Sequence, residues 1–231
     1  MNARVLLVGA VVVAALASVS PGAAATNECR GFLACVPIAG PWVVVPAKTT
    51  VPRQQVQFQL TCPRGFIVGG VDAELSDRAI EIGFLGTTGS PVSPGVTTSR
   101  SIVFVASYVG SGAPAPTFRP HAGCVPASGG GGRRTPTAAN AVVPPGQPTV
   151  RRVVTARVVS TKRIVAACRP AERLVAWYSA RGLSTEAPPS VDLVASLSAD
   201  VGPRGDRVVG VARARQGQGV VQVAAVCAGG Q

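Results

Sequence analysis

The amino-acid sequence predicts an all-β protein, built from two related antiparallel β-sandwich or barrel-like units that are stapled by disulfides and follow a signal peptide. Three observations predict this fold class. Apolar stretches of about four to eight residues, rich in Val and Ile, recur along the chain between Gly, Pro, Ser and Thr. Amphipathic stretches of helical length are missing, which argues against alternating β and α units. The chain has six cysteines, an even number that suits an oxidising compartment.

The N-terminus has the three parts of a secretory signal peptide. Arg4 supplies a positive charge, residues 5–19 form a short apolar run, and alanines at residues 23–25 provide an A-x-A cleavage site. About 15 apolar residues are too few to span a hydrocarbon core of ~30 Å comfortably, so a cleaved signal is favoured over a membrane anchor. We expect a mature chain that begins at Thr26, lacks a transmembrane segment and is secreted to the extracellular space or cell envelope.

Composition divides the rest of the chain into two units and a connector. Residues 126–149 are rich in Gly, Pro and Arg and have little apolar surface to bury, which is typical of a flexible or extended linker. After a signal peptide over residues 1–25, we therefore expect a first β unit over residues 26–125 and a second over residues 150–231.

Each unit shows the same order of strand-like runs around two cysteines. In the first unit, Cys62 and Cys124 accompany expected strands at residues 43–45, 56–60, 66–68, 80–85 and 102–108. In the second unit, Cys168 and Cys227 accompany expected strands at residues 150–154, 164–166, 174–175, 191–197 and 208–212. Residues 171–181 are the best helix candidate, but Val175 and Trp177 favour a strand. The matching order predicts an internal duplication, and the alternative is a chance likeness between short valine-rich strands.

The repeat also predicts how the cysteines pair. The expected disulfides are Cys62 with Cys124, Cys168 with Cys227, and the neighbours Cys29 with Cys35. Zinc is the other common role for cysteines, but the chain has no C-x-x-C pair and a single histidine. We therefore expect disulfides, no metal and no cofactor.

One short pattern resembles a known kind of sequence. Residues 62–65 are C-P-R-G and residues 68–70 are V-G-G, with a second cysteine in the last strand of the unit. This resembles a repeat of uncharacterised exported bacterial proteins with a C-P-x-G…G-G pattern. The second copy departs from it, since residues 168–171 are C-R-P-A and no Gly-Gly follows. The resemblance implies an exported setting and a repeat, and it implies no activity.

The sequence offers little support for nucleophilic catalysis. A hydrolytic triad needs a histidine beside a nucleophile, and His121 is the only histidine. No G-x-S-x-G elbow is present to expose a serine, and oxidised cysteines cannot act as nucleophiles. We expect His121 to be a surface or turn residue.

Four carboxylates fall close together at Asp72, Glu74, Asp77 and Glu81. A glycosidase needs two such groups across a cleft, and a calcium site needs several that converge. Because the cluster lies between two expected strands and has no counterpart in the second unit, a solvated turn is favoured. A secreted hydrolase that uses this cluster is the alternative.

Positive charge is concentrated in the second half of the chain. Without Arg4, the first unit has seven basic and five acidic residues, whereas the linker and second unit have fourteen and five. Such a region is suited to anionic cell-wall polymers or glycans. The predicted contacts are Arg133, Arg134, Arg151, Arg152, Arg157, Lys162, Arg163, Arg169 and Arg173. The alternative is compositional, because 20 arginines against two lysines are typical of a GC-rich coding sequence.

These observations favour a non-catalytic secreted or cell-envelope β module that binds polyanionic envelope polymers. Sequence-specific nucleic-acid recognition is not expected, because Trp177 and Tyr178 are the only aromatic side chains in the basic half for bases to stack on. The ligand and the oligomeric state are not encoded in any motif.

Overall fold

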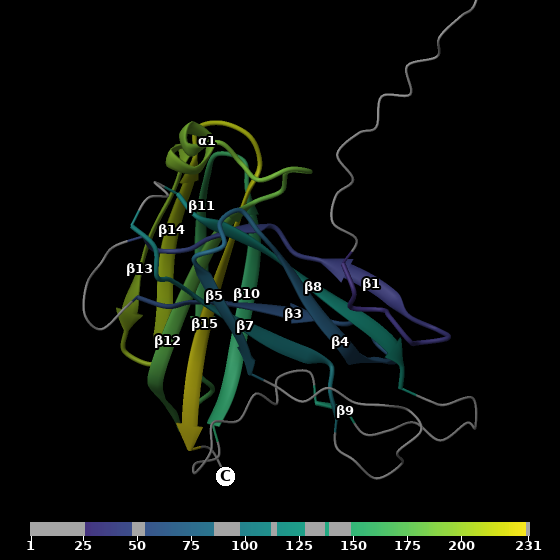
Figure 1. Cartoon of the computed structure of the whole chain (residues 1–231). Helices are drawn as coiled ribbons and strands as arrows, with labels where there is room; N and C mark the ends of the chain where they lie inside the picture. The colour runs from purple at the N-terminus through teal and green to yellow at the C-terminus, as the bar shows by residue number, and fades with distance from the viewer. Residues whose placement is uncertain are drawn as a thin grey trace, which may run out of the picture.

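Figure 1 shows the computed structural model, which describes residues 26–47, 54–85, 98–111, 115–127, 137–138 and 149–229. The predicted signal peptide, residues 1–25, lies outside the described residues. Most of the predicted linker, residues 128–136 and 139–148, also lies outside them.

The described chain is nearly all β structure, which confirms the predicted fold class. The N-terminal half contains β1 (Val36–Ala39), β2 (Trp42–Val44), β3 (Val56–Thr61), β4 (Phe66–Leu75), β5 (Ile80–Leu85), β6 (Thr98–Ser99), β7 (Ser101–Tyr108) and β8 (Thr117–Pro126). The C-terminal half contains β10 (Thr149–Val158), β11 (Thr161–Ala167), β12 (Glu172–Leu183), α1 (Val191–Ser196), β13 (Leu197–Arg204), β14 (Arg207–Ala214) and β15 (Gly219–Gly229). Between the halves, β9 (Thr137–Ala138) pairs with β6 in the one parallel ladder of the described strands.

A seven-stranded antiparallel sheet runs through both halves of the molecule (Figure 1). In the N-terminal half, β8 pairs with β4 along one edge and with β1 and then β2 along the other. β2 pairs on its far side with β12, where Val43 lies opposite Gly182, and the sheet continues through β15 to β10. β2 is therefore the strand that joins the two halves.

The two halves share one plan of strand pairing. Each has a small antiparallel sheet, β3-β7-β5 in the first half and β11-β14-β13 in the second, as well as its share of the large sheet. The bulges also match: β4 shifts register just after the pair of Val68 with Cys124, and β12 shifts just after the pair of Leu174 with Cys227. This likeness agrees with the predicted duplication, which stays a prediction.

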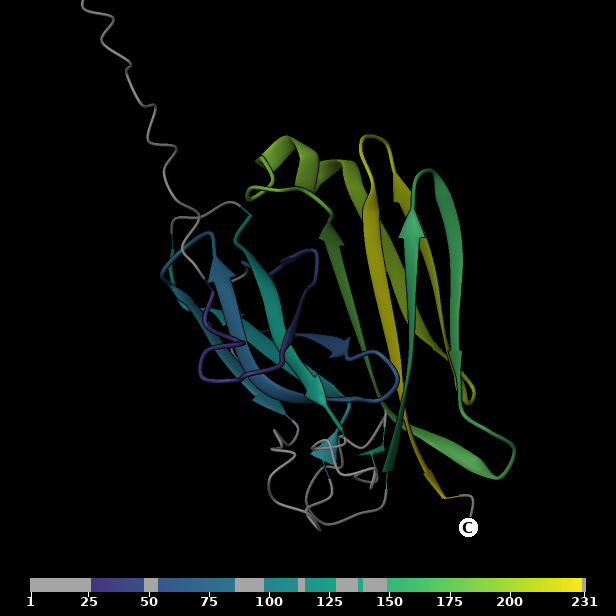
Figure 2. The same cartoon turned by 90° about the vertical axis from the view of Figure 1, so that its right-hand side faces the viewer.

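Two apolar clusters fill the space between the sheets. In the N-terminal half, Val56, Phe58 and Leu60 of β3 pack in one cluster with Phe104 and Phe118. In the C-terminal half the second cluster is built mainly from small and branched side chains: Val158, Ile164, Val208, Leu197, Val221 and Val223. Figure 2 shows the two halves side by side, with the N-terminal half in purple, blue and teal.

A buried polar interface holds β3 against the large sheet of the C-terminal half. Because alternate residues of a strand face opposite sides, Gln57 and Gln59 point away from the apolar side of β3, and both are buried. The Gln59 N–H donates to Gln222 Oε1 (2.7 Å), and Gln222 Nε2 donates to the Gln59 carbonyl (3.0 Å). As a result, β15 is buried on both faces.

The strand expected for residues 171–181 is confirmed as β12, but the one expected at residues 191–197 is wrong. Most of that segment is the short helix α1. Ser190 caps it, since its Oγ accepts a hydrogen bond from the Leu193 N–H (3.3 Å), and Asp192 lies in its first turn. The helix capping by Ser190 therefore outweighs the strand preference of the valines, and the strand begins only at Leu197. No helix among the described residues has the length and apolar character needed to cross a membrane.

Candidate functional site

The three predicted disulfides are confirmed. The bridges join Cys29 to Cys35, Cys62 to Cys124 and Cys168 to Cys227, and all six cysteines of the chain lie in the described residues. The two long bridges span 62 and 59 residues and tie the end of a small-sheet strand to the large sheet in each half. The cysteines are therefore structural.

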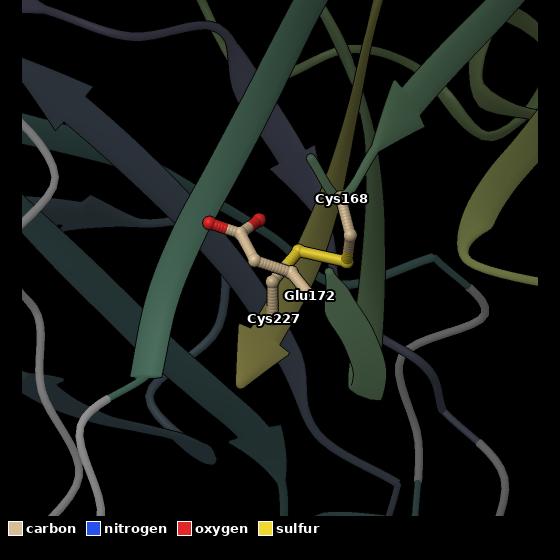
Figure 3. A group of neighbouring side chains, drawn as sticks. All are labelled: Cys168, Glu172 and Cys227. Carbon is tan, nitrogen blue, oxygen red and sulfur yellow. A yellow bond between two sulfur atoms is a disulfide. The ribbon is translucent and has the colours of Figure 1, made fainter. Parts of the chain in front are cut away.

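Glu172 lies beside the C-terminal disulfide, as Figure 3 shows, but this group does not form a metal site. Both sulfur atoms are consumed in the bridge, and the carboxylate points away from them in Figure 3. Arg152 Nε donates to Glu172 Oε2 (3.0 Å), and the Arg169 N–H donates to the same oxygen (2.7 Å). These hydrogen bonds lower the pKa of Glu172, and the one from Arg152 has the larger effect.

The expectation that His121 is a surface or turn residue is wrong. It lies in β8 with 7% of its surface exposed, between carboxylates from two other segments. His121 Nε2 is 2.8 Å from Glu74 Oε1, and Nδ1 is 3.8 Å from Glu28 Oε1. Arg119, two residues away on the same face, lies 3.9 Å from the same Glu74 oxygen. The side chain of His121 is therefore enclosed by the carboxylates of Glu28 and Glu74.

This polar cluster anchors the N-terminal segment to the outer face of the large sheet. Asp72 Oδ2 accepts a hydrogen bond from the Asn27 N–H (2.7 Å). A Cβ atom at Gly70 or at Gly123 would lie 2.1 Å from the Glu28 carbonyl oxygen, so only glycine lets the segment lie so close. The Cys29–Cys35 loop follows directly, with Phe32 packed near Ile67 and Val125.

The four predicted carboxylates are divided among three elements. Asp72 and Glu74 lie on β4, Asp77 lies in the turn after it, and Glu81 lies on β5 of the small sheet. Asp77 Oδ1 accepts a hydrogen bond from the Ala79 N–H (2.7 Å) and so shapes the turn. Of the four, only Asp72 and Glu74 share a face, and both hold neighbouring segments in place.

Of the nine predicted polyanion contacts, the seven that the structure describes do not gather on one face. Arg133 and Arg134 lie outside the described residues, and Arg152 is paired with Glu172. Exposed positions are occupied by Arg157, Lys162, Arg163, Arg169 and Arg173. In the ladders, Arg163 lies on the small sheet, whereas Arg157 and Arg173 lie near opposite ends of the large sheet.

The prediction for Arg151 is wrong, because this side chain belongs to the buried interface between the halves. It is 3% exposed, its Nη1 donates to Gln57 Oε1 (2.6 Å), and its guanidinium lies 5.0 Å from the centre of the Tyr178 ring. Burial lowers the pKa of Arg151 to about 10, so it stays charged at neutral pH. Nε and Nη2 have no hydrogen-bond partner among the described residues.

An exposed basic surface is present on the outer face of β11-β14-β13. The inward residues Ile164, Val208 and Ala212 belong to the core, so the alternate residues face solvent. These include four exposed arginines, which we call the basic face: Arg163, Arg204, Arg207 and Arg213. Asp200 is the one acidic residue on that face of the three strands.

Register brings the arginines of the basic face together in pairs. Arg204 lies directly opposite Arg207 at one end of the sheet. At the other end Arg163 pairs with Val211 and Arg213 pairs with Thr161, which makes the two arginines diagonal neighbours. Three of these four arginines fall beyond the dense run at residues 133–173. The signal that places Arg207 and Arg213 on one face of a strand is their even spacing of six residues across a valine-rich run.

A cleft lies where the two halves meet, beside β12. It has a volume of about 790 Å³ and is lined by β2, β3, β12, α1 and β13, with Trp177, Ser179 and Arg181 along one side. One edge of β12 pairs with β15 along its length, whereas the other edge pairs, among the described strands, with β2 at Gly182 and Leu183. Trp177 is 38% exposed, and Arg181 Nη1 donates to the Leu197 carbonyl (2.8 Å).

Comparison with known proteins identifies no relative, since no family model, curated protein or solved structure matches the chain.

Proposed function

We propose that this chain is a secreted, non-catalytic β module that binds anionic polymers of the cell envelope through the basic face. The observation that carries the proposal is the placing of Arg204 opposite Arg207 on an exposed sheet. Like charges in directly opposite positions destabilise a sheet unless something compensates them. A phosphate, sulfate or carboxylate group between the two guanidinium groups provides that compensation through bidentate hydrogen bonds.

The geometry of the sheet suits a polymer better than a small anion. Arg207 and Arg213 lie six residues apart on β14, which at ~3.4 Å per residue separates the two arginine pairs by about 20 Å. A single anion reaches one pair only. A chain of repeating negative charges reaches both, and the second contact then forms at a high effective concentration.

Several contacts support a non-catalytic reading of the acidic residues. Asp72 and Glu74 bind the N-terminal segment and His121, and Asp77 shapes a turn. A hydrolase that used this cluster would need at least two of these carboxylates free to face substrate. Their structural contacts favour the binding module over the secreted hydrolase.

The proposal includes export and duplication. The disulfides suit an oxidising compartment, and the signal-like N-terminus predicts cleavage after Ala25. The shared strand plan and matching bulges support descent of both halves from one ancestral unit. N-terminal sequencing of the exported protein tests the first point: Thr26 is expected, and recovery of Met1 in the membrane fraction would contradict it.

The binding proposal is tested with the full disulfide-bonded chain and immobilised heparin as the polyanion. Replacing the four arginines of the basic face with glutamine should lower affinity at least tenfold at 50 mM salt. It should also reduce the slope of log affinity against log salt by about 3, because fewer counterions are released.

A matched variant controls for net charge. Arg30, Arg64, Arg78 and Arg157 are exposed away from the basic face, and four Arg→Gln changes there remove the same charge. This variant should bind within about twofold of the parent protein. Equal losses in both variants would show that overall charge alone attracts heparin, and the absence of binding by the parent would remove the proposal.

A further inference from the structure

We propose that the cleft beside β12 binds a short segment of an acidic polysaccharide, with a pyranose ring on Trp177 and a sugar carboxylate on Arg181. The inference goes beyond the proposed function, because the cleft shares no residue with the basic face and is a second site with its own ligand. Three observations on the described residues carry it: an exposed aromatic side chain, a cation with no carboxylate beside it in the cleft, and a strand edge with no partner strand.

Trp177, Ser179 and Arg181 are alternate residues of β12, so their side chains lie on one side of the strand. Trp177 leaves 38% of its surface exposed at the cleft, which is unusual for the largest apolar side chain. The C–H face of a sugar ring packs against such a flat surface. An exposed indole beside a polar lining is typical of sites that take a partly apolar, partly hydroxylated ligand.

Arg181 supplies the charge. Among the described residues that line the cleft there is one cationic side chain, Arg181, and no carboxylate. Its hydrogen bond to the Leu197 carbonyl holds the guanidinium in place through Nη1. The other N–H groups of the planar guanidinium can then donate two parallel hydrogen bonds to a carboxylate, which the ammonium group of a lysine cannot do.

The third observation concerns the backbone. Before Gly182, the edge of β12 away from β15 has no partner strand among the described residues. Its N–H and C=O groups can therefore bind hydroxyl groups of the sugar. Gln54 and Gln55 add exposed amide groups at the opposite side of the cleft.

The chain carries a built-in reporter for this site. It has two tryptophans, and Trp42 is 1% exposed whereas Trp177 is 38% exposed. Quenching of fluorescence by iodide therefore reports on Trp177. A hexamer of galacturonic acid should protect Trp177 from iodide, and its fully methyl-esterified form, which keeps the sugar and loses the charge, should bind at least tenfold more weakly.

Calorimetry on variants completes the test. Trp177→Leu and Arg181→Gln should each lower affinity for the acidic hexamer at least tenfold, while Arg181→Lys, which keeps the charge and the fold, should lower it about fivefold. The basic-face variant should lose heparin binding but keep the hexamer. Circular dichroism and an unchanged heparin affinity of the Trp177 and Arg181 variants show that they are folded.

Each failure points to one proposal. If heparin binds and the basic face matters, but the hexamer neither protects Trp177 nor binds, the cleft inference falls and the proposed function stands. If hexaglutamate binds as tightly as the hexagalacturonate, the unpaired edge of β12 takes an acidic peptide and the sugar proposal is overturned.

Discussion

Two glycines allow the N-terminal segment to lie on the large sheet. Gly70 on β4 and Gly123 on β8 both face the carbonyl of Glu28 so closely that any side chain at either position would displace it. The contacts of Asp72 with Asn27 and of His121 with Glu28 depend on that approach. Gly70, the second residue of the G-G pair noted in the sequence, therefore has a local physical role, which is the close contact of its backbone with that of Glu28.

Replacing Gly70 with alanine should lower the free energy of unfolding by about 1–3 kcal/mol, because the added methyl group overlaps backbone that has no room to move. Denaturant unfolding without reductant measures the change. Trypsin should also cut faster at the exposed Arg30. Gly83→Ala is the matched control, since its Cβ would meet nothing within 4 Å, and it should alter stability by less than about 0.5 kcal/mol. Equal effects would contradict the account.

Substitution of Arg151 tests whether its buried charge raises or lowers the stability of the fold. Arg151→Met keeps the length of the side chain and removes a buried charge that has few partners, so stability should change by less than about 1 kcal/mol or increase. Gln57→Leu, which keeps the charge and removes its acceptor, should cost about 2–3 kcal/mol. Neither variant should change heparin affinity. A weaker affinity for Arg151→Met would return Arg151 to the set of polyanion contacts.

At the scale of elements, the sequence best predicts those strands whose residues follow a local apolar pattern. Alternating apolar residues predict β3, because one of its faces must be buried, and short runs rich in Val and Ile predict β7 and β14. The pairing in the two long bridges follows from the repeat, since Cys62–Cys124 and Cys168–Cys227 occupy equivalent places in the two halves. The segment at α1 shows the limit, because Val191 and Val194 suit a strand until the capping by Ser190 is considered.

The disulfides should differ in what they contribute. A bridge that closes a loop of about 60 residues removes more disorder from the unfolded chain than one that closes a short loop, with chain-entropy values of about 4 and about 2 kcal/mol. Unfolding of Cys168→Ala/Cys227→Ala and Cys29→Ala/Cys35→Ala double variants checks this order. A larger loss from the short bridge would contradict this order. It would indicate that Cys29–Cys35 acts mainly by holding native contacts, such as those of Phe32, and not by restricting the unfolded chain.

At the scale of the whole molecule, the features that decide function come from tertiary contacts. β2 joins the two halves because it pairs with β8 on one side and with β12 on the other. The sequence of its three residues does not predict partners from both halves. Arg151 lies in a basic run but is buried by β3, whereas Arg204 and Arg207 look isolated in sequence and lie opposite each other in the sheet. Density of charge along the chain therefore does not identify which arginines lie together on an exposed sheet.

The most direct measurement is to locate the bound polyanion by arginine footprinting. The full chain is treated with phenylglyoxal, with and without heparin, and modified arginines are quantified by mass spectrometry of peptides. The account predicts protection of Arg163, Arg204, Arg207 and Arg213 at low salt, with no change at Arg30, Arg64 and Arg78. Protection spread evenly over all exposed arginines, or confined to the N-terminal half, would contradict it.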